Sequence, residues 1–145
     1  MLRTRKSIVA AALVGAVGMT LATGGTAEAA TTLKASLSGK KEVPQAANGS
    51  GSARITLRAR KRQVCFDITL KNVGTTVMGH IHKGGKSVAG PIVVPLYDSP
   101  ETQPSGCVSA KRKLIRAIKR HPRRYYVNVH TAEFPAGAAR GQLHR

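Results

Sequence analysis

The fold is decided by residues 53–70, whose sequence is ARITLRARKRQVCFDITL. Apolar residues alternate with polar ones through both halves of this stretch: Ala53, Ile55, Leu57, Ala59, Val64, Phe66, Ile68 and Leu70. Because strand side chains point to opposite faces in turn, this period of two predicts two half-buried strands. Lys61-Arg62 stands between them and predicts the turn of a β-hairpin.

Five further segments are predicted as strands, namely residues 33–37, 77–82, 92–96, 125–130 and 140–143. Pro95 restricts one of them to the edge of a sheet, because proline has no backbone N–H to donate. About seven short strands, separated by glycine, proline and asparagine, predict an all-β sandwich or barrel that forms one domain.

One short helix interrupts this pattern at residues 109–120. Ser109 is its predicted N-cap, and His121-Pro122 is expected to end it. Residues 98–106 contain Pro100 and Pro104, so we expect a connecting loop there.

Residues 1–29 have the layout of a secretory signal peptide. Basic residues precede the uncharged run IVAAALVGAV at residues 8–17, and Ala27-Glu28-Ala29 is a cleavage site of the small-x-small type. A membrane anchor is the alternative, but a spanning helix needs about 20 apolar residues. We therefore expect an exported protein made of residues 30–145, with no membrane span after cleavage.

Cys65 and Cys107 are the two cysteines of the chain. An oxidising compartment favours a disulfide between them, and two reduced thiols are the alternative.

Several motifs follow one another in a recognisable order. They are Leu37-Ser38-Gly39, Glu42-Val43-Pro44, Gly79-His80-Ile81-His82, Gly90-Pro91-Ile92-Val93-Val94, Tyr125-Tyr126-Val127-Asn128-Val129-His130, Phe134-Pro135-Ala136-Gly137 and Arg140-Gly141-Gln142-Leu143. This succession resembles the CHRD domain, which is named for chordin and occurs in many exported bacterial proteins. One position departs from the family pattern: Ala138 stands where relatives usually carry an acidic residue.

The resemblance implies an immunoglobulin-like β-barrel with a distant similarity to copper/zinc superoxide dismutases. In animals such domains belong to an extracellular antagonist of growth factors. The resemblance therefore favours a non-enzymatic, extracytoplasmic binding or structural module, with an extracellular protein as one possible partner.

His80 and His82 lie two residues apart on a predicted strand, so their side chains face the same side. If the strand that contains His130 lies beside it, the three imidazoles can bind one copper or zinc ion, with nitrogens about 2.0–2.1 Å from the metal. Such an ion requires imidazoles within about 4 Å of one another. Alternatively, the histidines only hydrogen-bond to one another and to nearby carbonyls. A superoxide dismutase site needs more histidines, together with an acidic zinc ligand, and the histidines of this chain are too few for it.

The 24 Lys and Arg residues outnumber the 6 Asp and Glu residues, which gives a net charge of +18. Cleavage after Ala29 removes three basic residues and Glu28, so the exported chain keeps +16. The first strand of the predicted hairpin and the predicted helix at residues 109–120 are expected to present a basic surface. Its residues are Arg54, Arg58, Arg60, Arg112, Arg116, Lys119 and Arg120. Anionic cell-envelope polymers are its expected partners, and a merely solubilising role is the alternative. Export and the 3% aromatic content argue against nucleic acid.

Overall fold

The computed structural model of this protein describes residues 28–46 and 49–145. Almost all of the predicted signal peptide, residues 1–29, therefore lies outside the described residues. Within the described part of the chain, no helix is both long enough and apolar enough to cross a membrane.

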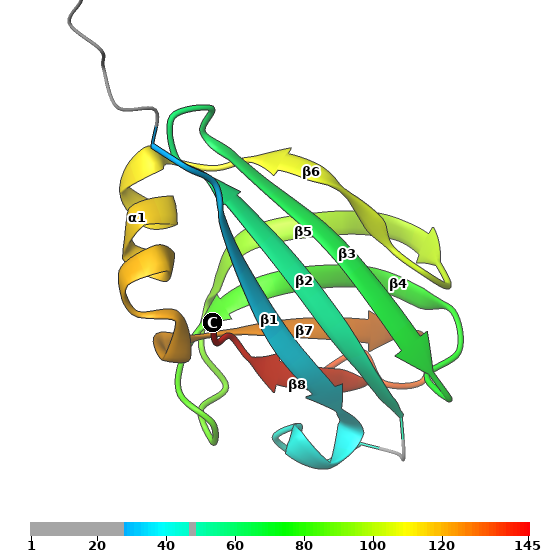
Figure 1. Ribbon diagram of the computed structural model, residues 1–145. Coiled ribbons are helices and arrows are strands. Elements are labelled where there is room, and N and C mark those ends of the chain that lie inside the picture. The colour runs from blue at the N-terminus through cyan, green and yellow to red at the C-terminus, as the bar shows by residue number, and fades with distance from the viewer. Residues whose placement is uncertain (1–27, 47–48) are drawn as a thin grey trace, which may run out of the picture.

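Eight strands form one antiparallel sheet that curls into a nearly closed barrel (Figure 1). The strands are β1 (Thr31–Ser38), β2 (Ser50–Arg58), β3 (Gln63–Lys71), β4 (Thr76–Lys83), β5 (Ile92–Glu101), β6 (Ser105–Ser109), β7 (Tyr125–Thr131) and β8 (Ala139–Gln142). Their order across the sheet is β5-β4-β7-β8-β1-β2-β3-β6, and β5 and β6, at the two ends, also contact each other. The all-β prediction is confirmed, with eight strands instead of about seven.

The hairpin predicted from residues 53–70 is present as β2 and β3. All eight of its alternating apolar residues are buried, and Arg58 pairs with Gln63 where the two strands meet the turn. The turn is closed by the backbone N–H of Arg62, which donates to the carbonyl of Ala59 at 3.2 Å. Arg62 adopts a left-handed conformation with φ of 54°. The local alternation therefore sufficed to predict this part of the sheet.

The predicted loop at residues 98–106 is wrong, because β5 continues to Glu101 and β6 begins at Ser105. β6 is a short edge strand of mainly exposed residues, so its sequence has no apolar alternation to reveal it. Cys107 lies directly opposite Cys65 in the pairing of β6 with β3, and the two form a disulfide. The predicted disulfide is thereby confirmed.

The helix α1 (Arg112–Arg120) begins later than predicted, because β6 extends through Ser109 and Lys111 is the N-cap. Ile115 and Ile118 are fully buried against the barrel core. Figure 1 shows α1 beside one end of the barrel. The helix ends at His121, as expected, and a short 3-10 helix, η2 (Pro122–Arg124), leads into β7.

β7 and residues 79–82 of β4 are buried on both faces. Ile81, Val127 and Val129 point into the apolar core. The side chains between them point outward, and they too are buried, so that all seven residues of β7 are buried. A second, polar layer of buried side chains therefore covers the outer face of these strands.

Candidate metal centre

The polar layer is built from three neighbouring strands, β4, β7 and β8. In the register of the sheet His80 lies opposite Asn128, and His82 lies opposite Tyr126. Asn128 in turn lies opposite Arg140 on β8. Since residues opposite one another share a face, these five side chains form one polar group.

The structure brings His80, His82 and His130 together at one end of this layer. One ring nitrogen from each lies within 4.8 Å of the other two, and all three side chains are buried. The Nδ1 atom of His80 is 3.2 Å from the Nε2 atom of His130. Ligand nitrogens of a tetrahedral zinc site are about 3.4 Å apart. The His80–His130 pair matches this spacing, whereas the 4.8 Å span of the cluster exceeds the expected limit of about 4 Å, so the three imidazoles must draw closer together to share one ion.

Two backbone carbonyls fix the orientation of two of these imidazoles. The Nδ1–H of His82 donates to the carbonyl of Gly90 at 2.8 Å, and that of His130 donates to the carbonyl of Pro135 at 3.0 Å. Each bond places the proton on Nδ1 and the lone pair on Nε2, which is the tautomer of metal-binding histidines. The Nε2 lone pair of His130 accepts a hydrogen bond from the Nδ1–H of His80 at 3.2 Å, so an ion bound there would replace this hydrogen bond. The Nε2 atom of His82 is buried and has no hydrogen-bond partner among the described residues.

All three imidazoles are held in the neutral form. Burial, together with the nearby His130 and His82, lowers the pKa of His80 to about 4. Burial also lowers the pKa of His82 and of His130, more than their carbonyl partners raise it. Neutral imidazole is the form that binds metals, so protons compete little for this site at pH 7.

Arg140 closes the site through a loop, residues 84–91. Its guanidinium donates to the carbonyls of Gly85 at 3.0 Å and Val88 at 3.1 Å. The same guanidinium lies 3.5 Å from the ring centre of Tyr126, which also stacks on His82. Arg140 therefore holds the loop in place, and the loop in turn contacts His82 through the carbonyl of Gly90.

Glu42 is a buried acid that the sequence analysis did not assign to the site. It is 5% exposed, and a side chain placed on Gly137 would touch both its carboxylate and the amide of Asn128. Glu42 Oε1 and Asn128 Oδ1 have no hydrogen-bond partner among the described residues. Burial raises the pKa of Glu42 to about 7, although Arg140 acts in the opposite direction. The one sequence signal for Glu42 was its place in the motif Glu42-Val43-Pro44.

The basic residues predicted as one surface are spread over two regions and engage in several contacts. Arg58 donates to Gln63 Oε1 at 3.1 Å, and Arg112 donates to the carbonyl of Ala59 at 3.3 Å. Arg116 and Lys119 each lie 3.5 Å from the carboxylate of Glu28. The remaining members are exposed: Arg54, Arg60 and Arg120.

Comparison with known proteins supports one relationship. No curated protein and no solved structure matches the chain. The CHRD domain family matches residues 33–143, which include all of the barrel except the first two residues of β1 and contain every residue of the histidine cluster. CHRD domains are extracellular. The chain belongs to the CHRD domain family.

Proposed function

We propose that this chain is an exported, non-enzymatic extracytoplasmic domain that binds one copper or zinc ion through His80, His82 and His130. The observation that supports it best is the convergence of three buried ring nitrogens within 4.8 Å. Export rests on the signal-peptide pattern of residues 1–29, and the disulfide is compatible with an oxidising compartment.

The chemistry of the three imidazoles favours these two metals. Nitrogen ligands suit copper and zinc, and divalent copper binds more tightly than zinc to a given nitrogen site. Each of the three histidines is at most 8% exposed. An ion held there would have restricted access to solvent and substrates, which favours a bound structural or stored metal over turnover.

Metal titration of the purified protein tests this proposal. We expect uptake of one copper or zinc ion per chain, and X-ray absorption should give nitrogen ligands at about 2.0–2.1 Å. Replacing His82 by alanine removes the ligand with the free, buried Nε2 atom. We expect His82→Ala to raise the dissociation constant at least about 100-fold, equivalent to about 2.8 kcal/mol.

His121→Ala is the matched control, because His121 is exposed and lies outside the cluster. It should leave uptake unchanged, and circular dichroism should show that both variants are folded. The metal function is refuted if the wild-type protein takes up no stoichiometric metal, or if His82→Ala binds as tightly as His121→Ala.

Binding to an anionic partner is a second candidate function, which the net charge of +18 supports. It does not depend on the metal, because the basic side chains lie on the surface and the histidines lie below the loop.

A further inference from the structure

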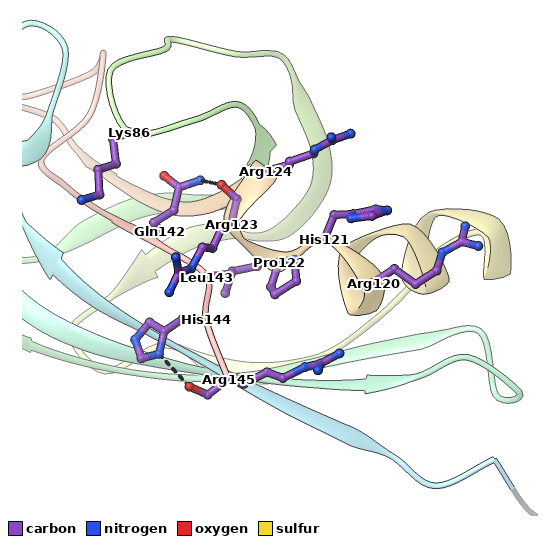
Figure 2. A pocket seen from close by; sticks show the side chains of 10 residues that line it. All are labelled: Lys86, Arg120, His121, Pro122, Arg123, Arg124, Gln142, Leu143, His144 and Arg145. Carbon is purple, nitrogen blue, oxygen red and sulfur yellow. Dashed lines mark hydrogen bonds between the residues drawn. The ribbon is translucent and has the colours of Figure 1, made fainter.

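An open hollow of about 1000 Å³ lies where α1, η2 and the C-terminal residues meet. Figure 2 shows the side chains that line it, arranged around Pro122 and the last residues of the chain. Its lining contains no acidic residue and includes these basic ones: Lys86, Arg120, His121, Arg123, Arg124, His144 and Arg145. All of these basic residues are exposed. The hollow therefore concentrates positive charge from four separate segments.

A second hollow of about 640 Å³ continues the first one along β8. The two share Lys86, Gln142 and His144 in their linings. The second adds Lys40 and Lys41, which are exposed beside β1. We call the two hollows together the basic groove. Its one acidic residue is Glu42, whose pKa is raised to about 7 by burial.

The floor of the basic groove is held in place by Gln142. Its Nε2 atom donates to the carbonyl of Gly84 at 2.7 Å and to that of Arg123 at 2.6 Å. The guanidinium of Arg145 donates to the carbonyl of Lys119 at 3.2 Å. The loop, η2, the C-terminus and α1 are thus joined, and the basic side chains project from a fixed frame.

We propose that the basic groove binds a linear polymer that carries repeated phosphate groups. A single small anion needs few donors, whereas this groove presents basic side chains along two connected hollows. Guanidinium groups bind phosphate through two parallel hydrogen bonds, and lysines add point charges. A chain of phosphates would therefore meet a donor at successive positions.

The lining also disfavours other anionic partners. It contains no phenylalanine, tyrosine or tryptophan, so the two imidazoles of His121 and His144 are its only aromatic rings on which nucleic acid bases could stack. Val43 is its one large exposed apolar residue, which is too little apolar surface to insert into a lipid membrane. These absences favour a phosphate polymer without bases or acyl chains.

This groove differs from the surface predicted from the sequence. Of the seven residues named there, Arg120 lines the groove, and Arg54 and Arg116 lie elsewhere. Two variants that lose equal charge therefore distinguish the two locations. The groove variant combines Lys86→Gln, Arg120→Gln and Arg123→Gln. The control variant combines Arg54→Gln, Lys113→Gln and Arg116→Gln, whose side chains are exposed and line neither hollow.

Binding of inorganic polyphosphate, measured by calorimetry over a range of salt concentrations, tests the proposal. EDTA in every sample keeps the histidine cluster free of metal, so the result does not depend on the proposed metal function. For a single-stranded polyanion, each phosphate contact adds about 0.7 to the magnitude of the slope of log K against the logarithm of the salt concentration. We expect the groove variant to lose about 2 from this slope and at least about tenfold in affinity at 0.15 M salt.

The control variant should bind within about threefold of the wild-type protein, since its charges lie outside the groove. Equal losses in both variants, at unchanged thermal stability, would show that only net charge matters and would overturn the proposal. Three other ligands test the chemistry. Polyglutamate of equal charge should bind more weakly than polyphosphate, and poly(glycerol phosphate) should bind comparably. Tighter binding of polyglutamate or of single-stranded DNA would also overturn it.

Discussion

At the scale of single residues, Tyr126 links the parts of the histidine site. β7 lies between β4 and β8, so the ring contacts His82 from one neighbouring strand and Arg140 from the other. The Tyr126 hydroxyl also accepts the backbone N–H of Gly90 at 3.0 Å. A cation over an aromatic face contributes about 0.5–2 kcal/mol, more when it is desolvated, and Arg140 is 2% exposed. One residue thus orients a candidate ligand and holds the covering loop.

Buried ionisable groups in this site make stability depend on pH in two opposite ways. The pKa of His80 is about 4 in the folded protein, so the unfolded chain binds its proton first, and stability is lost as pH falls from about 6.5. The pKa of Glu42 is raised from 4.5 to about 7, so the folded protein keeps a proton that the unfolded chain has released. The stability that Glu42 contributes is therefore fully present below pH 4.5 and is lost as the pH rises through about 7.

For the metal-free protein we expect the free energy of unfolding to be greatest near pH 6.5. Between pH 6.5 and pH 8 the ionisation of buried Glu42 should lower it by about 1 kcal/mol, and His80 should offset about half of this loss as the unfolded chain releases its imidazole proton. Glu42→Gln should remove this fall in urea unfolding curves recorded at several pH values. Glu133→Gln changes an exposed acid and should keep it. A fall of the same size in Glu42→Gln would show that another group is responsible.

At the scale of elements, β6 depends on its neighbour β3. β6 is an edge strand with mainly exposed side chains, so apolar burial stabilises it little. Its backbone pairing with β3 and the disulfide between Cys65 and Cys107 hold it in place. The bond also joins positions 42 residues apart, which restricts the unfolded chain.

Replacing both cysteines by serine should lower the free energy of unfolding by about 3–4 kcal/mol, as the chain-entropy model gives for a loop of this length. Because β6 has few other contacts, its amides should lose most of their protection in hydrogen exchange. The amides of β2, which is paired with β1 on one side and β3 on the other, should remain protected. Retained protection of Gly106 and Val108 in the double variant would contradict this view of β6.

At the scale of the whole molecule, positive charge is the dominant property. The chain carries 24 basic residues and 6 acidic ones. Within the described residues both ion pairs involve Glu28, which cleavage after Ala29 would remove. The folded domain therefore concentrates like charges that repel one another, and this repulsion opposes the compact state.

Screening of this repulsion should make the protein more stable in salt. We expect the melting temperature to rise by several degrees between 0.02 and 0.3 M sodium chloride, measured by differential scanning calorimetry. Polyphosphate at equal ionic strength should raise it further, because a ligand that binds only the folded state stabilises it. A melting temperature independent of ionic strength would mean that charge repulsion is negligible in this fold.

The sequence by itself determined the all-β class, the hairpin of residues 53–70, the end of the helix at His121, and the pairing of Cys65 with Cys107. The strands, the hairpin and the end of the helix follow from short-range patterns, because the period of two and the turn residues act within a few positions. The disulfide was predicted instead because the chain has two cysteines. It also placed His80 and His82 on one face. Short-range patterns could not reveal β6, since an exposed edge strand has no apolar face.

Only the tertiary structure determined which segments and side chains cover the outer face of β4 and β7. It folded the loop of residues 84–91 over the histidines, and it placed Glu42 beside Asn128, 86 positions further along the chain. It also decided where the charge gathers, because the basic groove joins segments from Lys40 to Arg145. Alternation predicts which face of a strand is apolar, but contacts between distant segments decide what covers the other face. For that reason the sequence predicted the three histidines and the excess of charge, and the fold determined the surroundings of both.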